Sequence, residues 1–244
     1  MHPVKSVPLI LVLAASFNVA AASPPVEGVN PADLLTQFQV TGEYNRISDD
    51  VDQWLLVGKF DYKLPNKPIG LNFEMPIQGV INTPNGSTRG HGDLFARVRY
   101  ILPVGRWQLG AAFEVVAPIG EEPLTGGRWQ TNPGVLAVYP WNERNITALV
   151  HKRVYGYISD DSGMPDINQY TNRVLQIYIS PSGWYAQADA QFWRDARSGE
   201  RWLDSRASIG RQLDARSRVQ LELKRLTGDR DTDYGISVSY AIKM

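Results

Sequence analysis

Residues 69–78 read IGLNFEMPIQ, and apolar and polar side chains alternate along this stretch. The apolar residues are the odd-numbered ones, from Ile69 to Ile77, and small or polar residues stand between them. A period of two is typical of a β-strand with one face against an apolar environment. About ten residues is also the length that a tilted strand needs to cross the hydrocarbon core of a membrane. The stretch therefore predicts a membrane-spanning strand.

The same alternation returns along the whole chain, most clearly in residues 93–102, 107–115 and 234–243. No amphipathic helical pattern of comparable length competes with it. Beyond residue 22, no stretch approaches the 18 or so apolar residues of a membrane helix. The runs lie near residues 34–44, 53–64, 69–81, 92–102, 106–119, 133–141, 146–158, 170–180, 184–193, 202–213, 217–226 and 234–244. The seventh, eighth and tenth are the least regular. The pattern predicts an all-β fold, a transmembrane antiparallel up-and-down β-barrel of about twelve strands.

The connections between these runs alternate in length. Short links rich in Pro, Gly, Asn and Ser have the composition of tight turns; they are residues 65–68, 103–105, 142–145, 181–183 and 214–217. Longer polar segments fall between them, near residues 45–52, 82–91, 120–132, 159–169, 194–201 and 227–233. Outer-membrane barrels alternate in this way because their periplasmic turns are tight and their outer loops are long. A soluble β-sandwich, the alternative, has no reason to do so.

The start of the chain is typical of a cleaved secretion signal. It has a weakly basic beginning with Lys5, a short apolar run, and small residues at positions 20–22. We expect a signal peptide over residues 1–22 and a barrel domain over residues 23–244, with residues 23–33 as a periplasmic lead. This arrangement predicts the outer membrane of a Gram-negative bacterium, with lipid and lipopolysaccharide as surroundings. The last strand resembles the signal that the barrel-assembly machinery reads, although it ends in Met244 and not in an aromatic residue.

Composition excludes several classes of protein. Lys5 is the only charged residue of the signal, so the mature chain has 24 Lys and Arg against 25 Asp and Glu. This balance lacks the basic excess that nucleic-acid binding requires. The chain has no cysteine, which excludes a thiolate metal site and a cysteine nucleophile. We expect no metal and no cofactor.

Charged residues on the polar faces are expected to point into the lumen, because a charge facing lipid is costly. Glu74, Arg97, Arg99 and Glu114 are the candidates, and folding the chain about residues 82–91 places Glu74 roughly opposite Arg99. Two interpretations stay open. The polar lining filters a small solute, or it is a salt-bridged core that fills a narrow barrel, as twelve strands allow both.

An enzyme is the third possibility, because some outer-membrane barrels hydrolyse lipids. A serine nucleophile needs a positioned base, normally histidine. Only His91 and His151 remain after signal removal, and neither stands in a His-x-Ser arrangement. Two histidines are also too few for a three-histidine zinc site. We therefore expect no enzymatic activity.

Several phrases resemble a family of outer-membrane barrel transporters, also described as "MetA-pathway of phenol degradation" proteins. They are Gly90-His91-Gly92-Asp93 with the run to Tyr100, Pro118-Ile119-Gly120, Thr125 to Gln130 with Pro133-Gly134, Pro165 to Gln169, Gly183-Trp184-Tyr185, and Ser198 to Trp202. Together they span about residues 90–202. The resemblance implies an outer-membrane location and passage of small solutes, aromatic compounds among them. It supplies no catalytic residue.

The aromatic residues in these phrases fall at strand ends. Trp129, Trp184, Tyr185 and Trp202 are expected at the membrane interface, where amphipathic rings are favoured. The leading functional prediction is a channel for passive transport of a small, aromatic or hydrophobic solute. The alternative is a closed structural or adhesive barrel whose outer loops contact lipopolysaccharide or a partner.

Overall fold

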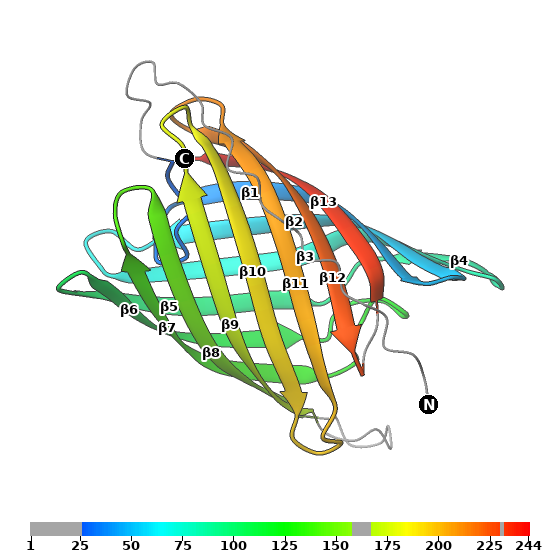
Figure 1. The fold of residues 1–244 in the computed structure, drawn as a ribbon. Helices are drawn as coiled ribbons and strands as arrows, with labels where there is room; N and C mark the ends of the chain where they lie inside the picture. Colours follow the sequence, from blue (N-terminus) through cyan, green and yellow to red (C-terminus); the bar gives the residue numbers. More distant parts are fainter. Residues whose placement is uncertain (1–25, 158–166, 230–231) are drawn as a thin grey trace, which may run out of the picture.

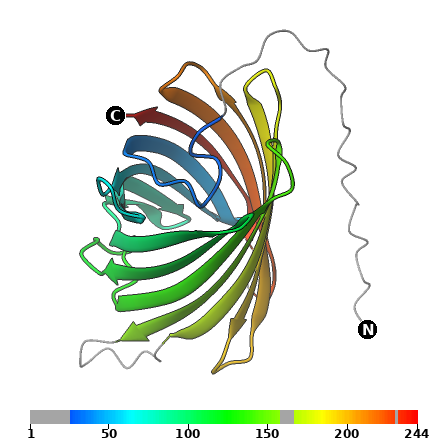
Figure 2. The same cartoon turned by 90° about the vertical axis from the view of Figure 1, so that its left-hand side faces the viewer.

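The structure is a computed structural model that describes residues 26–157, 167–229 and 232–244. The predicted signal peptide, residues 1–22, lies outside the described residues. Strands form one antiparallel sheet that closes on itself (Figures 1 and 2). They are β1 (Gln37–Ser48), β2 (Val51–Lys63), β3 (Ile69–Thr83), β4 (Gly86–Gly90), β5 (Leu94–Val104), β6 (Trp107–Ala117), β7 (Trp129–Pro140), β8 (Asn145–Tyr157), β9 (Asn168–Ile179), β10 (Trp184–Asp195), β11 (Arg201–Gln212), β12 (Ser217–Gly228) and β13 (Thr232–Lys243). Among the described residues no helix is long and apolar enough to cross a membrane.

The sheet closes through the pairing of the first strand with the last, β1 with β13. Strand β3 pairs with two partners on one side. Its far end, residues 79–83, pairs with β4, and its near end, residues 69–74, pairs with β5. Strands β4 and β5 therefore share one position in the wall. The thirteen strands occupy twelve positions, which confirms the predicted closed antiparallel barrel.

The two ends of the barrel carry different connections. One end, here called the turn end, carries the start of β1, the end of β13 and the short turns. The opposite end is here called the loop end, and two of its connections are shorter than the sequence predicted. The expected loop over residues 45–52 is a turn at Asp49–Asp50, and the expected loop over residues 82–91 is the β3–β4 hairpin. The strands continue past their apolar sections because backbone pairing satisfies the peptide groups whatever the side chains are.

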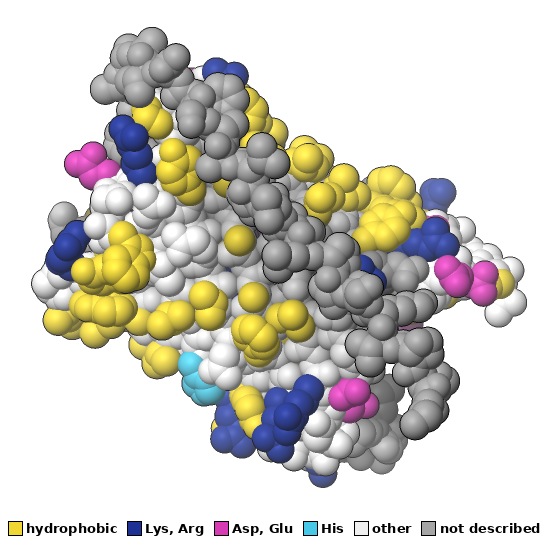
Figure 3. All heavy atoms as spheres, in the orientation of Figure 1, with side chains coloured by type: hydrophobic (Ala, Val, Ile, Leu, Met, Phe, Trp, Pro, Cys, Tyr) yellow, Lys and Arg dark blue, Asp and Glu magenta, His cyan; other side chains and the backbone are white. Residues whose placement is uncertain are grey.

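The two faces of the wall follow the predicted alternation. Large apolar side chains such as Phe73, Val98, Phe113 and Val238 are exposed on the outer face. Figure 3 shows hydrophobic side chains over the middle of this face, with most charged side chains toward its ends. The inner face carries buried polar side chains, among them Asp61, Asn72, Glu114 and Asp189. Exposed apolar patches of this extent mark a surface that is covered by an apolar environment.

The lead segment, residues 26–33, is folded into the barrel opening at the turn end (Figure 2). Its Val26, Val29 and Ala32 are buried in one apolar cluster with inward side chains of the wall. The wall side of that cluster is Ile101, Val138, Ile146, Ala148, Leu175, Ile177 and Tyr185. A periplasmic lead was predicted here from the sequence, but its entry into the lumen was not.

Candidate functional site

The lumen carries a belt of ionic groups, because inward positions on neighbouring strands meet at the same level. Glu114 of β6 is the centre of one group. Arg97 of β5 places its Nε 2.8 Å from one Glu114 oxygen, and Lys152 of β8 places its Nζ 3.3 Å from the other. Asn132 of β7 donates to the same carboxylate at 3.3 Å. A buried carboxylate is tolerated only with partners of this kind.

Asp61 of β2 is the centre of a second group. Gln37 and Asn72, on the strands at either side, donate to its two oxygens at 2.8 and 3.0 Å. The Arg99 guanidinium lies 3.6 Å from Asp61, and the Lys59 ammonium lies 3.9 Å from it. This group extends the belt from β5 to β1.

The belt continues around the opposite wall. Arg173 of β9 forms a two-pronged pair with Asp189 of β10, with distances of 2.9 and 2.6 Å. Arg206 of β11 binds Asp204 of its own strand at 2.7 Å and approaches Glu222 of β12 at 3.5 Å. Lys224 of β12 pairs with Glu43 of β1. Charged pairs therefore surround the lumen.

The strand register places all four residues that were predicted to line the lumen on the inner face. They are Glu74, Arg97, Arg99 and Glu114. The expected pairing of Glu74 with Arg99 is wrong. Glu74 lies opposite Phe95, and Arg99 lies opposite Gly70. The hairpin turns at Pro84–Asn85, two residues before the assumed midpoint, so the register moves by four residues.

Sequence reasoning missed part of the belt. Lys152, Arg173, Arg206, Asp204 and Glu43 also lie there. Several of them stand on the irregular seventh, eighth and tenth runs, where the alternation was too weak to assign a face. Their lumen-facing positions could have been found only by carrying the inward–outward alternation of the regular strands across the turns into these runs.

The lead segment is tied to the wall by polar contacts as well as by apolar ones. The Arg99 guanidinium donates to the Pro31 carbonyl at 3.1 Å, and Asn30 donates to Gln108 at 2.8 Å. The Arg218 guanidinium donates to the Glu27 carbonyl at 2.9 Å. The first two bonds are partly buried and satisfy polar groups that the segment covers.

Asp33 shapes the segment from within. Its carboxylate accepts the Gly28 N–H at 2.9 Å and closes a loop over residues 28–33. Burial raises the pKa of the Asp33 carboxyl above its ordinary value, and the Gly28 N–H acts in the opposite direction. Gly28 has a positive φ of 74°, a conformation that side chains disfavour. The fold of the lead segment thus depends on this pair.

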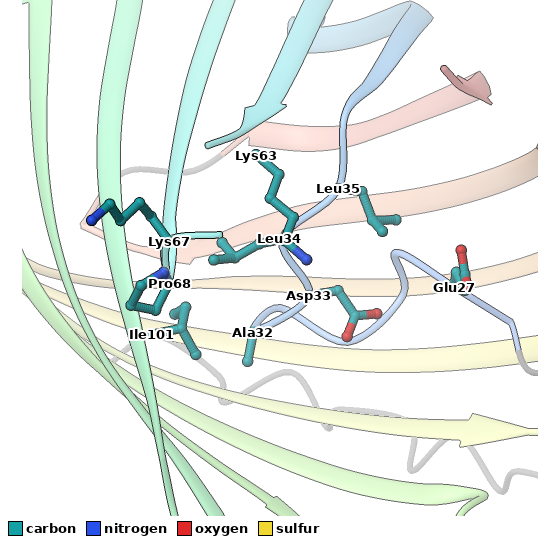
Figure 4. A pocket seen from close by; sticks show the side chains of 9 residues that line it. All are labelled: Glu27, Ala32, Asp33, Leu34, Leu35, Lys63, Lys67, Pro68 and Ile101. Atoms are coloured by element: carbon teal, nitrogen blue, oxygen red, sulfur yellow. The ribbon is translucent and has the colours of Figure 1, made fainter. Parts of the chain in front are cut away.

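A small pocket remains beside the lead segment at the turn end (Figure 4). Its volume is about 390 Å³. The segment supplies Ala32 and Asp33 to one side, and the β2–β3 turn supplies Lys67 and Pro68 to the other. Ala32 and Ile101 of the apolar cluster also line the pocket, which therefore borders that cluster.

The loop end is narrowed by the β6–β7 connection, residues 118–128. Asp93, which directly precedes β5, accepts hydrogen bonds from the Gly120 N–H at 3.1 Å, the Thr125 hydroxyl at 2.7 Å and the Gly126 N–H at 2.7 Å. A carboxylate that receives several such donors is a strong local anchor. The connection is therefore anchored to residues 91–93, which separate β4 from β5, and this contact is here called the latch.

Glycines make room for this latch. Gly79 and Gly90 face each other across β3 and β4 on the inner side. A Cβ on Gly79 would lie 2.8 Å from the Leu124 side chain, and one on Gly90 would lie 2.5 Å from the Glu121 carboxylate. The phrases Gly90-His91-Gly92-Asp93 and Pro118 to Gly126, noted separately in the sequence, thus meet in space.

The four predicted interface aromatics divide into two pairs. Trp129 and Trp184 are exposed on the outer face at strand ends. For Tyr185 and Trp202 the prediction is wrong, because both are buried inside the barrel. Neighbouring residues on a strand point to opposite faces, so Trp184 and Tyr185 could not both face lipid. Trp202 stacks on Trp193 with ring centroids 5.6 Å apart.

The two histidines lie apart and serve local structure. His91 Nε2 is 2.9 Å from the Ile119 carbonyl, and its Nδ1 is 3.4 Å from Glu121. His151 lies on the outer face beside Asn172, at 3.0 Å. Neither hydrogen-bonds a serine in the described part of the chain. The described residues also contain no group of three or more His, Asp or Glu arranged to hold a metal ion.

No protein-family model matches the chain, and no curated protein resembles it significantly in sequence. Solved structures do resemble it. An outer membrane channel from Pseudomonas putida F1 has a TM-score of 0.71 at 18% identity, covering 88% of this chain and 100% of that one. The NanC porin has a TM-score of 0.66 at 11% identity, covering 85% and 100%. The CymD monoaromatic hydrocarbon channel has a TM-score of 0.50 at 8% identity, covering 92% and 95%. The chain therefore has the fold of outer-membrane channel barrels.

Proposed function

We propose that this protein is a passive channel for a small solute in a bacterial outer membrane. The observation that carries the proposal is the contrast between the two faces of the closed wall. The outer face is apolar, whereas ionic groups surround the lumen from β1 to β12. A polar lumen inside an apolar surface is the arrangement that lets polar solutes cross a membrane. We place the turn end toward the periplasm, because the periplasmic turns of outer-membrane barrels are short.

The proposal includes the family and the surroundings that the sequence predicts. Membership of the phenol-degradation transporter family is supported by the meeting of two of its phrases at Asp93. Passage of an aromatic compound is supported by likeness to the fold of a monoaromatic hydrocarbon channel. Contact with lipopolysaccharide and insertion by the barrel-assembly machinery follow from the proposed location. The proposal includes no enzymatic activity, because the solved barrels that this chain resembles are described as a channel and a porin.

A closed structural barrel is the second candidate, and a specific observation favours it. The lead segment fills part of the turn end, and residues 118–128 narrow the loop end. A barrel closed at both ends in all states would conduct nothing.

Two measurements decide between these candidates. Fractionation with a heat-modifiability gel first tests for a folded barrel in the outer membrane. The purified barrel is then added to a planar bilayer. Discrete conductance steps support the channel, whereas a folded barrel that gives no steps supports the structural alternative. Recovery as a soluble periplasmic protein would remove both.

A further inference from the structure

The acidic and basic members of the belt differ in how far they reach into the lumen. Side-chain exposure is 27% for Arg97 against 6% for Glu114. It is 36% for Arg173 against 6% for Asp189. The same order holds for Lys59 against Asp61, at 29% and 6%. Short carboxylate side chains lie back against the wall, and long cationic side chains cover them.

This arrangement gives the lumen a positive inner surface without a net charge. Coulomb energy falls with distance, so a solute near the axis interacts more strongly with the forward cations than with the recessed anions. Screening by salt, with a length of roughly 8 Å at physiological ionic strength, increases the difference. Some carboxylates are exceptions. Glu43 is as exposed as its partner Lys224, at 20%, Glu222 is 22% exposed beside Arg206 at 32%, and Glu74 is partly exposed.

The guanidinium groups that reach into the lumen also have N–H groups that their paired carboxylates do not use. Arg173 uses Nε and Nη2 for Asp189, and within the described residues its Nη1 has no protein partner. Arg97 approaches Glu114 through Nε and lies 5.0 Å from the centre of the Phe95 ring. A planar guanidinium with free N–H groups is suited to carboxylates, and the ring beside it offers an apolar contact.

We propose that the channel prefers small anions, and that organic carboxylates are the class of solute that it passes. The inference rests on the proposed channel function and goes further by naming the charge of the solute. The selectivity comes from the radial order of each ion pair, cation inside and carboxylate outside. It does not come from a surplus of basic residues.

The test is the reversal potential of the purified, folded barrel in a planar bilayer under a KCl gradient. We expect the sign of anion preference in the wild type. In Arg173→Gln/Asp189→Asn the net charge of the lumen is unchanged, but one forward cation is lost. We expect the reversal potential to move toward zero. Replacing chloride with benzoate, a small aromatic carboxylate, should leave a measurable anion current.

The matched control is Arg46→Gln/Asp49→Asn. It removes an Arg–Asp pair at the exposed end of β1, outside the lumen, in which the nitrogen and the oxygen are 3.2 Å apart. It should leave the reversal potential unchanged. Cation preference, a reversal potential near zero, no current with benzoate, or an Arg173/Asp189 double variant identical to wild type would each overturn the inference while conductance persists. A folded barrel without conductance would instead overturn the proposed channel itself.

Discussion

The two ends of the barrel are both narrowed by a segment that folds inward, and the balance between apolar burial and polar contacts differs between the two segments. At the turn end, Val26, Val29 and Ala32 lie against an apolar wall. At the loop end, three hydrogen bonds from residues 120–126 converge on Asp93. Burial is spread over many contacts and is non-directional, whereas the loop end is held mainly by directional contacts to Asp93 and His91. We therefore expect the turn end to tolerate a conservative substitution in the lead segment, and the loop end to loosen when Asp93 alone is replaced.

Removing the lead segment should have the largest effect. A mature chain that begins at Leu34 lacks the three buried apolar side chains and the Arg99–Pro31 contact. We expect a several-fold higher single-channel conductance than for a chain that begins at Ser23, because the turn end loses its obstruction. Planar-bilayer recording measures this directly.

A full-length variant separates obstruction from chain length. Val29→Asp removes a buried side chain worth about 1.5–3 kcal/mol and places a charge among apolar groups, so it should also raise the conductance. Val29→Ile keeps the apolar contact and serves as the control. Equal conductance in all these chains would mean that the lead segment does not close the turn end.

Breaking the latch should have a smaller effect that is confined to the loop end. Asp93→Ala removes the acceptor of three hydrogen bonds, and one bond to a charged group contributes about 1.5–3 kcal/mol. We expect residues 118–128 to detach and trypsin to cut faster after Arg128, with the barrel still folded. Asp49→Ala, at the exposed β1–β2 turn, is the control. Unchanged cleavage after Arg128 would show that the loop is held by packing, as at the turn end.

The smallest effect should come from the titration of Asp33. Burial raises the pKa of its carboxyl while the segment is docked, so the docked state binds the proton more tightly than the released state. As the pH rises from the ordinary value of 3.8 through the raised pKa, docking should therefore weaken and conductance should rise. Glu27 and Arg218 lie nearby and modulate the shift. Asp33→Asn should abolish this pH dependence, and a persistent one would assign it to another group.

Much of the fold could be predicted from residue patterns, and the failures have a physical cause. The runs that became β8 and β9 were irregular because their inward residues, such as Ala148, Leu175 and Ile177, are as apolar as their outward ones. These residues face the lead segment and not water. A strand that is apolar on both faces loses its period of two, so the irregularity marked the surface on which the lead docks.

The candidate site was predictable only in part. Alternation assigned Arg97, Arg99 and Glu114 to the inner face, because parity along one strand is a local property. Their partners across strands depend on register, and register depends on where each hairpin turns. The error at Glu74 arose from a turn located two residues too late. The same limit hid the contact of Lys152 with Glu114.

Residue patterns alone were enough to predict the strand class, about twelve positions in the wall and the side of the wall on which each regular strand presents its charges. These follow from periodicity and turn composition, which act over a few residues. The entry of the lead into the lumen, the anchoring of residues 120–126 by Asp93, and the recessed position of carboxylates such as Glu114 and Asp189 became visible in the three-dimensional structure. Each of these depends on contacts between residues far apart in the chain, whose geometry exists only once the barrel has closed.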